Sequence, residues 1–229
     1  MAAFAAMTAN WKQWSVTSTD PTRRQVMQLT LSVVAVASLP LAVRAQPSPN
    51  DWRGRLIAAA RAQIGVTRSY DPAYTAIAFP NGDVPREKGV CTDVVVRAYR
   101  DAFGVDLQAL VNADMRARFS DYPKAWGLKR PDPNIDHRRV LNLSTYFARH
   151  NAKIAGAAFK PTDVAPGDLV TMTLPGNLPH IGVASDRSGA DGRLMMIHNI
   201  GAGAEESDVL AIYALTGRYA FAPSLRDRS

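Results

Sequence analysis

Cys91 is the only cysteine of the 229-residue chain, and it stands in the stretch GVCTDVVVRAYRDAFG, residues 89–104. A thiol in the first turn of a helix lies where free N–H groups and the helix dipole favour a thiolate, which lowers the thiol pKa. Asp93 suits the same helix start but opposes that effect, so a nearby cation would help. The position favours a nucleophile over two other roles of a lone cysteine, a small buried hydrophobe and an intermolecular disulfide.

Two of the four histidines lie on predicted strands and are the candidates for that cation. His180 opens HIGVAS and His198 ends RLMMIH, whereas His137 and His150 lie in or beside a predicted helix. The intervening SDRSGADG can form the turn of a hairpin that puts His180 and His198 on one face. Acyl transfer needs a thiol, an imidazole that accepts and returns its proton, and a polar group that holds the imidazole in the useful tautomer.

The same residue types also suit a zinc site made of Cys91, His180, His198 and a carboxylate. The chain has no close ligand pair such as CxxC or HExxH. We therefore prefer nucleophilic chemistry and expect neither a metal nor another cofactor.

The composition is that of an ordinary globular protein, 47% hydrophobic and 21% charged. The formal net charge is +7, of which residues 1–45 carry +3, so +4 remains for the rest. This modest excess suits an anionic surface such as a bacterial cell wall. No Arg/Lys run interleaved with aromatic residues is present, which argues against nucleic-acid binding.

Helices and strands occupy different halves of the chain. The spacing of apolar residues predicts helices over 51–64, 91–103, 107–119 and 138–151, separated by loops rich in Pro, Gly and Asp. Farther on, DVAPGDLVTMTL, HIGVASDR, RLMMIHNI and VLAIYALTGRYAF are typical of a meandering antiparallel sheet. Helices followed by strands indicate an α+β fold, whose sheet must bring the two histidines to Cys91.

The order of these motifs resembles a known superfamily. A Cys at a helix start, then APGDLVTM, PHIGVAS and MMIHNIGAG, is similar to the NlpC-type branch of papain-like cysteine peptidases, the bacterial cell-wall endopeptidases. More closely, GVCTDVVVRAYR, YPKAW, PDPNIDHRRV, GDLVTM, LPHIGVASD and HNIGAG resemble the YijF-like bacterial family of unknown function, over roughly residues 51–222. The resemblance implies a papain-like fold, with N-terminal helices packed on a C-terminal antiparallel sheet.

By position, the resemblance makes Cys91 the nucleophile, His180 the general base and acid, and His198 the residue that orients His180. Tyr70 matches a tyrosine that helps to line the oxyanion site beside the Cys91 N–H, although packing within its loop explains it equally well. The chain reads VCTD where NlpC-type enzymes read DCSG. Asp93 is therefore either a helix-start carboxylate tolerated beside the thiol or part of a site with a different substrate choice.

The stretch NIDHRRV is a second candidate for contact with substrate. Asp136 is expected to cap the helix that begins near His137. In the functional interpretation, His137, Arg138 and Arg139 line the cleft and hold a substrate carboxylate, which an Arg fork binds bidentately. Arg218 stands where the YijF-like pattern has a His in its TGxY segment, so that segment is assigned no catalytic role.

The N-terminal stretch TRRQVMQLTLSVVAVASLPLAVRAQ contains an Arg pair, an apolar segment and a small-residue cleavage site. We expect residues 1–45 to be a signal peptide that resembles the twin-arginine type, 46–50 a linker and 51–229 one domain. Pro40 and the marginal apolar length argue against a transmembrane helix. The mature protein is therefore expected in the periplasm or cell envelope, as a monomer without a membrane span.

These features predict an exported cysteine hydrolase that cleaves an amide bond of peptidoglycan through an acyl-enzyme on Cys91. Two alternatives stay open. The first keeps the thiol chemistry and changes the substrate to a protein amide, or the reaction to a transfer. The second is an envelope-binding or scaffold protein with a vestigial site.

Overall fold

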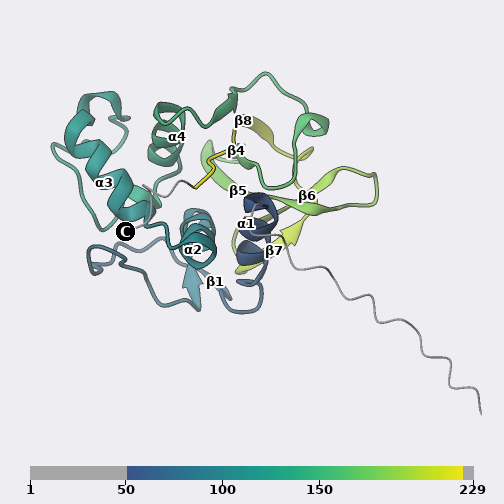
Figure 1. Ribbon diagram of the computed structural model, residues 1–229, viewed down its shortest axis with the longest axis horizontal. Helices are drawn as coiled ribbons and strands as arrows, with labels where there is room; N and C mark the ends of the chain where they lie inside the picture. The colour runs from purple at the N-terminus through teal and green to yellow at the C-terminus, as the bar shows by residue number, and fades with distance from the viewer. Residues whose placement is uncertain (1–50, 224–229) are drawn as a thin grey trace, which may run out of the picture. The chain divides into compact units, whose positions relative to one another are not determined.

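The computed structural model describes residues 51–223 (Figure 1). The helices are α1 (Trp52–Arg61), α2 (Cys91–Phe103), α3 (Leu107–Arg118) and α4 (Val140–Arg149), with short 3-10 turns at Phe119–Asp121, Asp136–Arg138 and Pro161–Asp163. The strands are β1 (Ser69–Tyr70), β2 (Lys88–Gly89), β3 (Lys153–Ala155), β4 (Leu169–Leu174), β5 (Leu178–Ser188), β6 (Leu194–Asn199), β7 (Ala204–Ser207) and β8 (Ala214–Tyr219). The predicted signal peptide and linker lie outside the described residues.

Helix α2 begins at Cys91 and is buried along most of its length. The Asp93 carboxylate accepts a hydrogen bond from the Val90 N–H at 2.7 Å, which satisfies a backbone donor at the helix start. The helix ends at Gly104, whose left-handed backbone (φ 69°) lets its N–H reach the carbonyl of Arg100. Both ends of the predicted second helix are confirmed.

Six strands form one antiparallel sheet in the order β3-β8-β4-β5-β6-β7. β5 and β6 form the predicted hairpin, in which Val183 pairs with Ile197 and Ala184 with Met196. His180 lies near the start of β5 and His198 near the end of β6. Because the two strands run antiparallel, both histidines fall at the same end of the hairpin.

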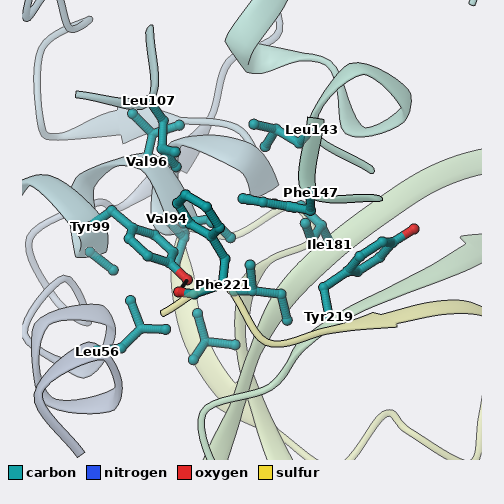
Figure 2. Packing of buried hydrophobic residues seen from close by; sticks show 14 of the residues in the cluster. Leu56, Val94, Val96, Tyr99, Leu107, Leu143, Phe147, Ile181, Tyr219 and Phe221 are labelled. Atoms are coloured by element: carbon teal, nitrogen blue, oxygen red, sulfur yellow. Dashed lines mark hydrogen bonds between the residues drawn. The ribbon is translucent and has the colours of Figure 1, made fainter. Parts of the chain in front are cut away.

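The larger hydrophobic cluster fills the space between the helices and one face of the sheet. Helices α1 and α2 lie side by side against β5 and β6 (Figure 1). Aromatic rings gather at the centre of this cluster, where Tyr99 and Phe147 pack against Phe221, and Tyr219 packs against Phe147 (Figure 2). The Tyr99 hydroxyl donates to the Phe221 carbonyl at 2.7 Å, so the C-terminal segment is tied to α2.

A smaller cluster lies on the strands and the loop that follows β7, and it includes Val170, Met172, Ala184 and Met196. Neighbouring residues of a strand point to opposite faces of a sheet. The sheet is therefore buried on the helix side by the larger cluster and on the other side by this one.

The α+β arrangement predicted from the sequence is confirmed. The predicted helix at 138–151 begins instead at Val140, because Arg139 takes an extended conformation (φ −107°, ψ 120°) between a 3-10 turn and α4. The short parallel pair β1–β2 and the edge strand β3 are not predicted by the sequence pattern. No helix within residues 51–223 is long and apolar enough to cross a membrane.

Candidate active site

The Cys91 thiol lies where the start of α2 meets β5. Its residue is only 3% exposed, and the backbone N–H of Ile181 on β5 points to the sulfur, together with the N–H groups of Cys91 and Thr92. Ile181 directly follows His180. The fold therefore brings the predicted nucleophile next to the strand position that carries the predicted base.

The pKa of the Cys91 thiol is nevertheless raised to about 11, and burial is the main cause. The Asp93 carboxylate raises it further, whereas the N–H groups around the sulfur lower it. The pKa lowering expected from the helix start is outweighed by removal of the thiol from water. Cys91 is a neutral thiol at pH 7.

His180 and His198 form a hydrogen-bonded pair. His180 Nε2 lies 2.8 Å from His198 Nδ1, and the rings meet edge to face at 81°. Both side chains are buried. Burial lowers the pKa of His180 to about 3, with a further contribution from His198, and it lowers the pKa of His198 to about 4. Both imidazoles are therefore neutral at pH 7.

A chain of hydrogen bonds continues from this pair to β7. His198 Nε2 lies 2.7 Å from the Ser207 hydroxyl, and Ser207 donates to Glu205 Oε1 at 3.3 Å. The strand register explains the arrangement, since His198 is paired with Glu205 and Met196 with Ser207. His198, Glu205 and Ser207 thus share one face of the sheet.

With Ser207 as donor to Glu205, the hydrogen bonds assign a tautomer to each histidine. An ionised carboxylate only accepts hydrogen bonds, so the hydroxyl that donates to Glu205 can accept the Nε2–H of His198. His198 Nδ1 then carries a lone pair and accepts the Nε2–H of His180. This leaves the lone pair of His180 on Nδ1, which has no hydrogen-bond partner among the described residues. His180 Nδ1 therefore carries a lone pair that no described residue uses.

The Cys91 sulfur makes no hydrogen bond to the ring of His180 within residues 51–223. His180 is paired with Met172, which belongs to the smaller cluster, whereas Ile181 belongs to the helix-side cluster with Cys91. The thiol and the imidazole therefore reach the start of β5 from different sides. Catalytic hydrogen bonds are often long in an unliganded site and shorten when substrate binds.

Asp93 and Arg138 form a buried, bidentate ion pair. Nε and Nη2 of Arg138 each lie 2.9 Å from a different Asp93 oxygen, and both side chains are almost inaccessible. The pair raises the pKa of Arg138, against the effect of burial. Asp93 thus has two structural tasks, the helix cap and the pairing of Arg138.

A cleft of about 180 Å³ opens over the thiol. Cys91, Tyr70 and Arg138 line it, together with Trp126 and Pro179. Burial raises the pKa of Tyr70 to about 12, and Cys91 and Asp93 add to that rise. The Tyr70 hydroxyl therefore stays protonated and can donate a hydrogen bond in the cleft.

The three candidate residues of NIDHRRV are dispersed. Arg138 lines the cleft but is paired with Asp93, and Arg139 lies over the Trp126 ring at 4.3 Å while it pairs with Asp136 at 3.3 Å. His137 is 2% exposed and does not line the cleft, and burial lowers its pKa to about 4. The structure therefore brings only Arg138 into the cleft, while Arg139 contacts the Trp126 side chain of its wall, and both arginines have a carboxylate partner.

Asp136 does not cap α4. Its carboxylate accepts the Asp132 N–H at 2.5 Å and so closes the turn that precedes the 3-10 segment. Arg218, which was assigned no catalytic role, pairs with the buried Asp168 at 2.5 Å. Among the described residues, no group of three or more His, Cys, Asp or Glu side chains has the arrangement of a metal site.

Ser207, Glu205 and Trp126 belong to the site but are not singled out by the sequence. The alternation in AEES could have indicated the first two, because a third strand paired with RLMMIH puts every second residue on the His198 face. Trp126 belongs to a loop, and no periodic pattern predicts which way a loop side chain points.

Comparison with known proteins shows the family of the chain and leaves the chemistry of this site open. Residues 57–221 match the model of a domain of unknown function, DUF1287. The chain is also 53% identical over 162 residues to the uncharacterized protein YijF of Escherichia coli K12, which covers 71% of this chain and 78% of that protein. The family model spans well over half of the chain, and the relative agrees with it. The chain belongs to the DUF1287 family.

Proposed function

We propose that this protein is an exported cysteine hydrolase of the papain-like, NlpC type, which cleaves an amide bond of peptidoglycan through an acyl-enzyme on Cys91. The observation that supports it best is the His180–His198 hydrogen bond at 2.8 Å, on the strand whose Ile181 N–H points to the Cys91 sulfur. An unprotonated imidazole nitrogen and a thiol are the groups that acyl transfer requires, and substrate binding has to bring them together.

Acylation begins with proton transfer from the Cys91 thiol to His180 Nδ1, while the sulfur attacks the carbonyl carbon of the amide. The oxyanion of the tetrahedral intermediate is stabilised by the Cys91 N–H and the Tyr70 hydroxyl. The C–N bond then breaks, and His180 gives its proton to the departing amine. A thioester on Cys91 remains.

Deacylation uses the same groups in reverse. His180 Nδ1 takes a proton from a water molecule, whose oxygen attacks the thioester carbonyl. The C–S bond breaks, the proton returns to the sulfur, and a carboxylic acid leaves. During each transfer, His198 accepts the Nε2–H of His180 and stabilises the imidazolium that forms.

The neutral resting state sets a condition on this scheme. Burial raises the thiol pKa to about 11 and lowers that of His180 to about 3, so a thiolate–imidazolium pair is unfavourable before substrate binds. Proton transfer then has to accompany attack on the carbonyl carbon. The rate should therefore depend strongly on how substrate brings sulfur and Nδ1 together.

The proposed location and substrate rest on the sequence. The Arg pair, apolar segment and cleavage site of the N-terminal stretch support export, and the net charge of +4 outside residues 1–45 suits an anionic wall. The resemblance to NlpC-type cell-wall endopeptidases supports an amide of peptidoglycan as the bond that is cut.

The test is incubation of the purified full chain with muropeptides, followed by mass analysis of the products. We expect a mass gain of one water across two fragments, lost in Cys91→Ala and strongly reduced in His180→Gln. His150→Gln is the matched control, because His150 is exposed at the end of α4. Cleavage at an unchanged rate by Cys91→Ala would exclude the proposal. Products extended by an added amine would instead show a transferase.

A second candidate is an envelope-binding protein whose site is vestigial. It is favoured by the 3% exposure of Cys91 and by the missing sulfur–imidazole hydrogen bond within residues 51–223. This candidate predicts muropeptide binding of equal affinity in the wild-type protein and Cys91→Ala, with no product in either.

A further inference from the structure

A second hollow, here called the outer groove, lies beside the Cys91 cleft. It has a volume of about 1080 Å³ and is lined by every residue from 127 to 134, by α3 through Asn112 and Arg116, and by Tyr74 and Phe79. The residues that flank the 127–134 segment, Trp126 and Ile135, line the cleft itself. The outer groove and the cleft therefore share one wall.

Three cations line the outer groove without a carboxylate partner. Arg116, Lys129 and Arg130 make no ion pair and no side-chain hydrogen bond within the part of the chain that the structure describes. Most other arginines near the cleft are paired, as Arg138 is with Asp93 and Arg139 with Asp136. The one acid of the groove, Asp132, already accepts hydrogen bonds from Tyr74 and from the Asn134 N–H. The groove thus has positive charge that no carboxylate of the described residues neutralises.

Asn112 gives an independent indication of a ligand. The residue is only 6% exposed, it lines the groove, and its amide makes no hydrogen bond to any described residue. The amide atoms of Asn112 keep some accessible surface although the residue as a whole is buried, so a ligand in the groove can reach them. By contrast, Asn134 uses both ends of its amide, donating to Tyr74 and accepting the Ile77 N–H. The Asn112 amide is free to bind a ligand through one donor and one acceptor.

Two exposed aromatic rings complete the groove. Tyr74 is 60% and Phe79 50% exposed. The Tyr74 hydroxyl is held by Asp132 at 3.0 Å and by Asn134 at 2.9 Å, so this ring is fixed in place. A fixed aromatic face attracts the C–H groups of a flat apolar surface, such as one side of a sugar ring.

We propose that the outer groove is a binding subsite for an anionic saccharide, next to the site of bond cleavage. The unpaired cations bind the carboxylate or phosphate of the sugar, the Asn112 amide binds its hydroxyl or acetamido groups, and the aromatic rings stack on its face. A site with a few polar groups between aromatic walls has the usual composition of a small-molecule pocket. The inference rests on the proposed function only for its biological setting, and the binding does not require Cys91 chemistry.

The test is calorimetric titration of the full-length Cys91→Ala protein with three sugars. N-acetylglucosamine is neutral, N-acetylmuramic acid adds a carboxylate to the same ring, and N-acetylglucosamine 1-phosphate adds a phosphate. We expect at least one acidic sugar to bind about tenfold or more tighter than the neutral one. The stronger of the two acidic sugars identifies the anion that the groove prefers.

Arg116→Gln/Arg130→Gln should lower the affinity of the acidic sugar to that of the neutral one. Lys153→Gln, a change of an exposed cation on β3, should leave it unchanged. Asn112→Ala should weaken the binding of both neutral and acidic sugars. If the Asn112→Ala protein does not fold, the arginine double variant and Lys153→Gln still test the proposal. Equal binding of all three sugars, full affinity in the double variant, or tighter binding of an acidic tripeptide than of any sugar would overturn the proposal.

The outcomes separate this inference from the proposed function. Acidic sugar that binds Cys91→Ala, while the wild-type protein cleaves no muropeptide, would support the subsite and refute the hydrolase. Cleavage of muropeptides without binding of acidic sugar would refute the subsite and support the hydrolase.

Discussion

Ser207 and Glu205 decide which nitrogen of His180 carries the proton. Their hydrogen bonds connect the buried histidine pair to β7. Because the Glu205 carboxylate only accepts, it determines which atom donates in each hydrogen bond of the chain. A site of this kind depends on residues that touch neither substrate nor sulfur.

Ser207→Ala should lower kcat on muropeptides about 10- to 100-fold with little change in KM, because His198 loses the partner that holds its tautomer. The tautomers can be read directly from the ¹⁵N shifts of the histidine rings. Nδ1–H of His180 should appear in the variant and not in the wild-type protein. Ser188→Ala, at the exposed end of β5, is the control. Unchanged kcat and unchanged ring shifts would mean that the chain of donors does not fix the base.

Asp93→Asn should lower the pKa of the Cys91 thiol. The change removes the negative charge that raises this pKa and leaves the Arg138 guanidinium unpaired beside the cleft. Breaking a buried ion pair on one side costs about 3–5 kcal/mol of unfolding free energy, so the variant should also be less stable. The rate of thiol alkylation against pH measures the first effect and urea unfolding the second. Asp101→Asn, which breaks the surface pair with Arg86, should do neither.

At the scale of elements, the start of α2 is held by close packing of the Asp93 and Arg97 side chains against Gly89. A Cβ on Gly89 would lie 2.9 Å from Asp93 Oδ2 and 3.1 Å from Arg97 Nη1. The Gly89 carbonyl accepts the Asn199 amide at 2.9 Å, which ties the loop before Cys91 to the end of β6. This joint positions the nucleophile relative to the hairpin.

Gly89→Ala should therefore destabilise the protein by about 1–3 kcal/mol, the usual cost of overpacking, and change the rate of Cys91 alkylation. Gly201→Ala is the matched control, because nothing lies within 4 Å of a Cβ there. Its effect on unfolding should stay below about 0.5 kcal/mol. Equal free energies of unfolding for the two variants would show that the contacts around Gly89 leave room for a methyl group.

The sequence predicts these elements well where buried apolar residues recur with the regular spacing of a helix or a strand. The ends of α2 are marked by Asp93 and Gly104, and the β5–β6 hairpin by two β-rich runs on either side of the polar stretch SDRSGADG. The prediction fails where contacts between distant residues determine the start of a helix or the partner of a side chain. The extended Arg139 delays α4, and the hydrogen bond between Asp132 and Asp136 replaces the predicted cap. Neither contact has a signature in local spacing.

The site is predictable in its residue types but not in its electrostatics. A lone Cys at a helix start and two strand histidines are visible in the sequence, and the structure brings them to one region. That Arg138 pairs with Asp93 and that burial raises the thiol pKa to about 11 both depend on long-range packing. Spacing along the chain carries no information on either.

At the scale of the whole molecule, three buried histidines should make the fold sensitive to acid. Burial lowers the pKa of His137 and His198 to about 4 and that of His180 to about 3. Between these values and the ordinary 6.5, the unfolded chain binds more protons than the folded one. The contribution of these three histidines to the free energy of unfolding is therefore fully present above pH 6.5, and it decreases as the pH falls below that value.

For His137 alone, the loss between pH 7 and pH 5 is about 2 kcal/mol. Urea unfolding at several pH values should show this dependence, and it should be weaker in His137→Gln. His150→Gln, at an exposed position, should retain the full dependence. A stability that is flat from pH 7 to pH 5 in the wild-type protein would contradict neutral burial of these rings.

The most direct test of the central claim is the mass of the intact protein during reaction with muropeptides. The account predicts a covalent adduct on Cys91 that equals the acyl fragment, appears within the first turnover and is released by hydroxylamine, as a thioester is. Cys91→Ala should form no adduct and release no amine. Amine release by Cys91→Ala, or steady turnover of the wild-type protein with the adduct on another residue, would contradict it.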